Sequence, residues 1–553
     1  MSLVFEPAAP AAPADASRAD VACFVGFVGR RAGRPLPEAL RAQLDAGGWV
    51  TGPWARPAAQ VEALLNLPLV LDSWHLFDRF YAWDERPLDT PETPDPLDPI
   101  DPSRTAPRRC ASYLGAAVRS FFARGGKRAI VVRVGDPWPY LEDSAQRAAQ
   151  RTARLALLLP ATDPAADPFA PHDPSTWQGL QHLHGLPDDS LLVLPDLPDV
   201  LAVVPPPPDP DRPPAPQPEG FVPCDVEAPP PRDRSILRVP APRLDDAAFA
   251  RWRQVLRDVR EFLDHRQRTT MLLAALPLPL AGSQAAKGLH AQADARAWLE
   301  QTQVLRSAFD EDTQPGRRPA EALSQLAWPW LRTRAARGDL PQGLEPADGV
   351  LAGLVAQGAI ARGTFRSVAG DASLPLLRDL GGAEPMPSWG LGDDSPTGRL
   401  AQRVCLFAPG ADGWALQSDV STSALDPWRF GGATRLIGTI LRAARRAGDG
   451  AVLEPNGPRL WAHLRGTLED LLAGFWREGA FSGAAMSDAF EVICDRTTMT
   501  QNDLDAGRLI AHVRVRPAMS IERITVVLQL GQATGASVPS ASASAAPFLP
   551  EAA

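Results

Sequence analysis

Lysine is almost absent from this chain of 553 residues, which contains only Lys127 and Lys287, so nearly all of its positive charge comes from arginine. Acidic residues outnumber basic ones by 65 to 56, which gives a formal net charge of −9. Proteins that bind nucleic acid usually present a strongly basic face. The composition therefore argues against nucleic acid as the main partner, although it leaves room for a local basic patch. A GC-rich genome is the simplest explanation of the arginine excess.

Cysteines are few and long hydrophobic runs are missing. The five cysteines are scattered, with no close pair and no zinc-ligand spacing, so we expect reduced thiols in a protein made in the cytoplasm. The start of the chain lacks the charged-then-apolar pattern of a secretory signal. No apolar run approaches the roughly 20 residues that cross a bilayer. We therefore expect no stable membrane insertion, and any extracellular role requires release by another route.

Catalytic motifs are also missing. The sequence has no nucleophile elbow, no HExxH pair and no phosphate-binding loop. His182 and His184 form the only close histidine pair, and we interpret them as surface-loop residues rather than metal ligands because no ligand cluster accompanies them. The sequence therefore predicts no catalytic residue, no cofactor and no metal site, and it gives no reason to expect an enzyme.

Short apolar runs alternate with amphipathic segments along the first half of the chain. Val21–Val28, Arg128–Val134 and Leu191–Leu194 have the continuous hydrophobicity of buried strands. Tyr113–Gly126 has the pattern of a helix that ends at a glycine pair. A phosphate-binding loop is the alternative for these glycines, but such loops follow a strand and precede a helix, which is the reverse order. The alternation predicts an α/β fold.

The later part of the chain repeats this alternation. Trp252–Asp264 is typical of an amphipathic helix, Thr269–Leu278 of an apolar strand, and Thr434–Arg446 of another helix. Asp89–Pro107 is acidic and proline-rich. A calcium site could be imagined there, but the loop lacks the glycine turn of a calcium-binding loop, so we favour a solvated linker. A second proline-rich stretch at 205–242 predicts an insertion with little regular structure.

The segment 453–515 carries the strongest structural pattern. Asn456 is a plausible helix cap and Pro458 suits a first helical position. Apolar residues then recur at three- and four-residue steps as far as Phe475, which predicts a helix of about five turns. Phe490–Cys494 and Leu509–Val515 follow as strands, separated by a long polar connection.

This segment resembles the C-terminal domain of contractile tail sheath proteins, which build phage tails and contractile injection systems. The matching stretches are Leu453–Asn456, Leu460–Trp461, Phe475–Ala480, Cys494–Thr500 and Asp505–Ile510. The helix–glycine–strand unit at 113–134 and the aromatic–proline stretch Ala327–Leu331 are similar to the same family.

The resemblance implies a multi-domain α/β fold of mixed sheets with extended terminal arms. We expect a flexible N-terminal arm at 1–20, an N-terminal sheath-like region at 21–155 and a middle α/β region at 156–400 that includes the proline-rich insertion. A C-terminal sheath domain at 401–530 and a disordered tail at 531–553 complete this expected organisation.

The resemblance also implies a function. A sheath subunit stacks in sixfold rings around an inner tube and stores conformational energy that contraction releases without a nucleotide. Its partners would be other sheath subunits in a helical stack, the inner tube protein, and baseplate and terminator proteins. Assembly would take place in the cytoplasm, as part of a phage tail-like or extracellular contractile injection particle. The alternative is a standalone α/β hydrolase or ligand-binding protein with a pocket of convergent polar groups.

Subunits of this family exchange terminal arms that add strands to a neighbour's sheet. The candidate donor residues here are Leu3, Val4 and Phe5 at one end, and Ile524, Val526 and Leu528 within Ile521–Leu530 at the other. The N-terminus departs from the family because it lacks the usual Pro-Gly-Val-Tyr type of strand. A minor or baseplate-proximal sheath paralogue would explain such a reduced arm.

Overall fold

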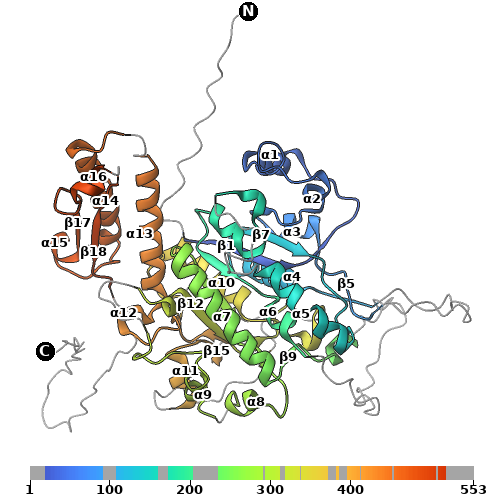
Figure 1. The fold of residues 1–553 in the computed structure, drawn as a ribbon. Helices are drawn as coiled ribbons and strands as arrows, with labels where there is room; N and C mark the ends of the chain where they lie inside the picture. The colour runs from blue at the N-terminus through green and yellow to red at the C-terminus, as the bar shows by residue number, and fades with distance from the viewer. Residues whose placement is uncertain are drawn as a thin grey trace, which may run out of the picture.

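The computed structural model describes residues 19–90, 108–159, 172–203, 235–290, 293–311, 318–334, 336, 338–370, 382–384, 395–410, 413–450, 454–505 and 508–518. Figure 1 shows a central sheet with helices on both faces and a smaller unit of helices and strands beside it. The six candidate donor residues lie outside these described ranges.

The central sheet has eight strands. Its order is β16 (Gly413–Leu416), β15 (Cys405–Gly410), β12 (Ser324–Trp328), β10 (Met271–Ala275), β8 (Leu191–Val193), β1 (Val21–Phe27), β7 (Arg128–Gly135) and β3 (Pro68–Leu71). The six inner strands run parallel, and the two edge strands β16 and β3 are antiparallel to their neighbours. Parallel strands covered on both faces need apolar residues at every position, which is why the apolar runs predicted β1, β7, β8 and β10 correctly.

Helices cover both faces of this sheet (Figure 1). Along β1, Ala22 and Phe24 belong to one hydrophobic cluster, whereas Cys23 and Val25 belong to the other, because successive side chains of a strand point to opposite faces. The first cluster includes α4 (Tyr113–Ala123) and α10 (Asp348–Arg362). The second includes α6 (Leu197–Leu201) and α7 (Asp246–Arg266), and α5 (Ser144–Leu158) packs beside it.

Two buried contacts fix the helices on the first face. At Gly349 in α10, an added Cβ would lie 2.6 Å from the Cα of Ala117 in α4, so glycine permits the close approach of these helices. The Asp196 carboxylate, just beyond β8, accepts hydrogen bonds from the backbone N–H of Phe27 (2.7 Å) and of Leu114 (3.1 Å). Asp196 therefore joins the end of β1 to the first turn of α4.

Shorter elements connect these layers. They are β2 (Gly29–Arg30), α1 (Glu38–Ala46), α2 (Ala58–Ala63), α3 (Trp74–Phe80), β4 (Tyr81–Ala82), β5 (Arg86–Pro87), β6 (Arg109–Cys110), β9 (Arg243–Leu244), β11 (Leu278–Pro279), α8 (Gln284–Gly288), α9 (Ala295–Gln301), β13 (Trp330–Leu331), β14 (Ala383–Glu384), α11 (Pro396–Ala401) and α12 (Asp426–Arg429).

The smaller unit follows the last strand of the central sheet. It contains most of α13 (Gly431–Gly450), then α14 (Pro458–Arg477), α15 (Met486–Ala489), β17 (Phe490–Ile493), α16 (Gln501–Asp505) and β18 (His512–Val515). All of these elements except α16 contribute to a third hydrophobic cluster. The central sheet runs across the boundaries expected at 155/156 and 400/401, since β8, β10 and β15 all pair within it.

Three local expectations were wrong. The N-cap of α14 is Gly457, while the Asn456 side chain accepts a hydrogen bond from the Trp461 indole N–H at 2.7 Å. The polar connection after β17 contains the helix α16. His182 lies in a 3-10 helix and is 1% exposed, packed against Trp49, rather than in a surface loop. Burial, with a smaller contribution from the Arg56 charge, lowers the pKa of His182 to about 3, so this ring stays neutral.

Candidate assembly surface

The smaller unit is built on α14. Pro458 occupies its first turn, where a missing N–H costs nothing, and its inward face is apolar. The buried residues of that face are Leu460, Leu464, Leu468, Leu472, Ala473 and Phe475. Gly479 ends the helix with a φ of +83°, and the Ala480 N–H donates to the Phe475 carbonyl at 2.9 Å.

A two-stranded antiparallel sheet packs on α14. Phe490 lies opposite Val515 and Val492 opposite Val513, and all four side chains face the apolar cluster. On the other face, Glu491 and Arg514 form an ion pair of 2.9 Å, with side chains 52% and 71% exposed. The sheet is therefore apolar on the α14 side and charged on the other, as expected for a strand pair that covers one side of a core.

The outer edge of β17 carries backbone groups that β18 does not use. The Arg516 N–H donates to the Ala489 carbonyl at 2.9 Å. Hydrogen-bonded pairs alternate along an antiparallel ladder, so this bond puts the backbone groups of Glu491 toward β18 and those of Phe490 and Val492 away from it. Such an edge can pair with a further strand.

A groove of about 1060 Å³ runs beside this strand. One wall is the α14 stripe that includes Arg465, Glu469 and Ala473, and the other is formed by 486–493, which includes all of β17. Arg465 pairs with Glu469 at 2.8 Å along its wall. The lining mixes charged and apolar residues and also includes Arg514–Arg516, and the free backbone edge of β17 borders it. This combination suits an extended peptide better than a small molecule.

The junction between the smaller unit and the central sheet contains a buried ion pair. Arg435 in the first part of α13 donates to the two carboxylate oxygens of Asp419 at 2.9 and 2.6 Å, and the side chains are 3% and 0% exposed. Burial alone would raise the pKa of Asp419, but the Arg435 charge and the hydrogen bonds from Arg435, Val368 and Gln325 hold it below its ordinary value. Nothing in the sequence distinguishes this arginine from the others.

The described chain enters and leaves near these features. Ala19, the first described residue, is 2% exposed and precedes β1. Ala518, the last described residue, donates its N–H to the Ala480 carbonyl at 2.8 Å, beyond the end of β18. The structure therefore shows a groove beside β17 that the sequence did not predict, and the predicted donor residues lie outside the described ranges. The cross-strand alternation at 490–492 and 513–515 was the one signal for the groove.

Other kinds of site have little support among the described residues. No group of three or more histidine, cysteine, aspartate or glutamate residues in the described ranges could hold a metal ion. Across the same ranges, no helix is both long enough and apolar enough to span a bilayer. The described cysteines, Cys23, Cys110, Cys405 and Cys494, are all buried and free.

Comparison with known proteins places the fold. No protein-family model and no curated protein matches the chain. A chain of the anti-feeding prophage (AFP) baseplate in contracted state aligns over 96% of this chain and 97% of its own length, with 16% identity and a TM-score of 0.53. A chain of the AFP helical sheath in contracted state aligns over 96% and 98%, with 15% identity and a TM-score of 0.48. The sheath tail protein DSY3957 of Desulfitobacterium hafniense aligns over 94% and 100%, with 8% identity and a TM-score of 0.36.

The chain thus has an α/β fold similar to that of this AFP baseplate chain. The alignment with the AFP baseplate chain spans nearly the whole of both chains and carries this conclusion. The expected resemblance is confirmed at the level of the fold.

Proposed function

We propose that this protein is a structural subunit of a contractile sheath, in a phage tail-like particle or an extracellular contractile injection system, rather than an enzyme. The observation that carries the proposal is the full-length likeness in fold to a chain of the AFP baseplate. The open edge of β17 supports it, because a subunit that joins others by strand addition must offer an unpaired edge.

Each subunit would receive a strand from a neighbour in the groove beside β17. The donor is Ile521–Leu530, in which Ile524, Val526 and Leu528 alternate with Thr525 and Val527. Their period of two would place these three side chains on one face of the added strand, toward α14. The N-terminal residues Leu3, Val4 and Phe5 are a shorter second donor.

Contraction in this proposal is a change of packing between subunits, with no nucleotide consumed. The inner tube, the baseplate and the terminator proteins are the further partners. A difference of a few kcal/mol per subunit between extended and contracted packing is comparable to a large part of one domain's stability. Summed over a stack of rings, it would be enough to drive a tube forward.

The experiment that tests the proposal is negative-stain electron microscopy of the full chain, alone, co-expressed with the tube protein encoded nearest to it, and co-expressed with that tube protein and a baseplate protein. Stacked rings or hollow cylinders would establish a main sheath subunit. A single ring that forms only with a baseplate protein would establish a baseplate-proximal paralogue. Discrete particles in every combination would contradict a role in a sheath.

A further inference from the structure

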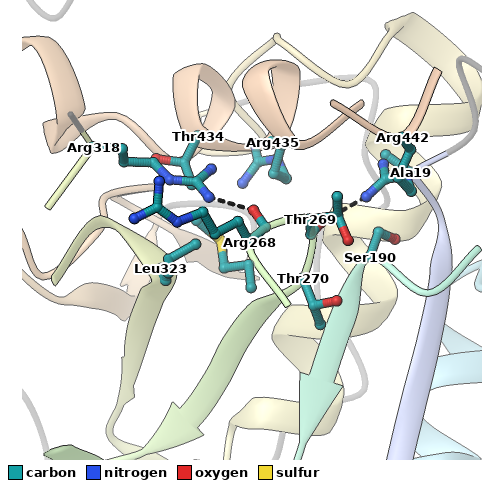
Figure 2. A pocket seen from close by; sticks show the side chains of 11 residues that line it. Ala19, Ser190, Arg268, Thr269, Thr270, Arg318, Leu323, Thr434, Arg435 and Arg442 are labelled. Carbon is teal, nitrogen blue, oxygen red and sulfur yellow. Dashed lines mark hydrogen bonds between the residues drawn. The ribbon is translucent and has the colours of Figure 1, made fainter. Parts of the chain in front are cut away.

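A small cavity lies at the junction of the central sheet and α13. Figure 2 shows its lining. Residues just before three parallel strands contribute to it, namely Ala19 before β1, Ser190 before β8 and Thr270 before β10. Thr434 from the first turns of α13 also contributes to the lining. The cavity volume is about 10 Å³, roughly the space that one water molecule or one ion of similar size requires.

The charged side chains that line this cavity are all positive. Four arginines line it, Arg268, Arg318, Arg435 and Arg442, and its lining contains no aspartate or glutamate. Three of the four are compensated nearby. Arg435 pairs with Asp419, Arg268 pairs with Asp264 at 3.0 Å, and the field of Asp189 acts on Arg442.

Arg318 is less well compensated, because the only carboxylate field that acts on it is that of Asp264, which already pairs with Arg268, and the Arg268 charge opposes it more strongly. Arg318 is 7% exposed, and its Nη2 donates a hydrogen bond to the Arg268 backbone carbonyl. Among the described residues its guanidinium has no carboxylate within ion-pair distance, and its Nη1 is buried with no hydrogen-bond partner. A buried cation without a counter-ion is strongly unfavourable, which is why buried charges in proteins are almost always paired.

A second donor lacks a partner at the same cavity. Thr434 is 2% exposed, and its Oγ1 is buried without a hydrogen-bond partner. In Figure 2 the Arg318 guanidinium lies between Thr434 and Arg435 in the view, and Arg318 and Thr434 both line the cavity. Thr434 also belongs to the first turns of α13, and the start of a helix favours negative charge.

We propose that this cavity binds a monovalent anion of the size of chloride, held by Arg318 Nη1–H and the Thr434 hydroxyl. The cavity is too small for sulfate, phosphate or an organic acid, and its four arginines disfavour a cation. The anion provides the counter-charge that Arg318 lacks among the described residues. Because it contacts α13 on one side and the chain beside the central sheet on the other, it stabilises their junction. This inference is independent of the proposed function.

Two measurements on the full chain test it. Crystals soaked in sodium bromide should give an anomalous peak between Arg318 and Thr434. In solution, the Tm in chloride should exceed the Tm in gluconate at equal ionic strength, and it should rise by roughly 1 °C for each tenfold increase in chloride above the Kd. Gluconate is too large for the cavity, so it controls for screening of surface charges.

Variants assign the effect to this cavity. Arg318→Met and Thr434→Val should each abolish the difference between chloride and gluconate. Arg514→Met should keep it, because that side chain is 71% exposed and lies on the outer face of β18. An absent bromide peak, or a chloride response unchanged in Arg318→Met, would overturn the proposal and leave the cavity to water. If Arg318→Met does not fold, the bromide peak and the chloride response of Thr434→Val decide whether the cavity binds an anion.

Discussion

Arg435 of α13 and Asp419, which follows β16, form a buried two-point ion pair that connects the smaller unit to the central sheet. Its N–O distances are 2.9 and 2.6 Å, and Gln325 of β12 donates to the same carboxylate at 2.7 Å. The pair therefore joins a strand of the sheet, the chain beyond β16 and the start of α13. It is one of several contacts at this junction, together with the Arg442 hydrogen bond to the Thr269 carbonyl and the Arg446–Asp188 ion pair.

Removing one member of the pair should be strongly destabilising. Arg435→Met leaves the Asp419 charge buried without its partner, and we expect the free energy of unfolding to fall by about 3–5 kcal/mol. Urea unfolding followed by circular dichroism measures the change. Arg514→Met is the matched control, since it breaks an exposed ion pair and should cost about 1 kcal/mol or less.

The double variant Arg435→Met with Asp419→Leu separates the ion pair from packing. If the cost comes from the unpaired charge, the double variant should be more stable than Arg435→Met alone. A double variant that is less stable than the single one would show that Asp419 contributes mainly through its other hydrogen bonds.

Gly349 should tolerate no side chain. A Cβ at this position would lie 2.6 Å from Ala117 Cα and 2.7 Å from its carbonyl oxygen, so α10 and α4 would have to separate. We expect Gly349→Ala to destabilise by about 1–3 kcal/mol. Gly466→Ala in α14 is the control, because nothing lies within 4 Å of its added Cβ, and it should stabilise by up to about 1 kcal/mol. Equal thermal shifts in the two variants would contradict the close helix contact.

Stability should decrease between pH 4 and pH 7. Burial is the main cause that raises the pKa of four carboxyl groups to about 7, those of Asp189, Asp196, Glu345 and Asp348. In this pH range the folded state binds more protons at these groups than the unfolded state does. Their contribution to the free energy of unfolding is therefore largest at low pH and is lost as the pH rises through about 7. Urea unfolding at pH 6 and pH 8 should give the higher free energy at pH 6.

Asp196→Asn tests one of these groups. Its pH dependence should be smaller than that of the natural chain, whatever the absolute stability, because asparagine does not titrate. Asp136→Asn is the control, since the Asp136 side chain is 73% exposed and its replacement should leave the pH slope unchanged. A slope that stays the same in Asp196→Asn would show that Asp196 titrates alike in both states.

Much of this fold could be predicted from the sequence, because buried parallel strands and amphipathic helices leave local patterns. The apolar run at 21–28 predicted β1, and the helical pattern that ends at a glycine pair predicted α4. Pairing partners leave no such pattern, so β15 was assigned to a C-terminal domain although it pairs with β12 in the central sheet. The burial of His182 was missed for the same reason, since Trp49 reaches it from a distant part of the chain.

The candidate site was predicted only in part. The alternation at 513–515 predicted β18, but the groove depends on how α14 lies beside β17, which is a tertiary contact. The Asp419–Arg435 pair left no signal because the chain is rich in arginine and the two residues occupy unremarkable sequence positions. The proposed donor strand at 521–530 remains a prediction.

The most direct test of strand addition compares two truncations by negative-stain electron microscopy, each co-expressed with the tube protein. One variant lacks residues 521–553, which removes the proposed donor strand, and the other lacks only 532–553. Circular dichroism should show that both are folded. The account predicts rings or cylinders for the full chain and for the shorter deletion, and single subunits for the longer one. Cylinders formed equally well without residues 521–553 would contradict it.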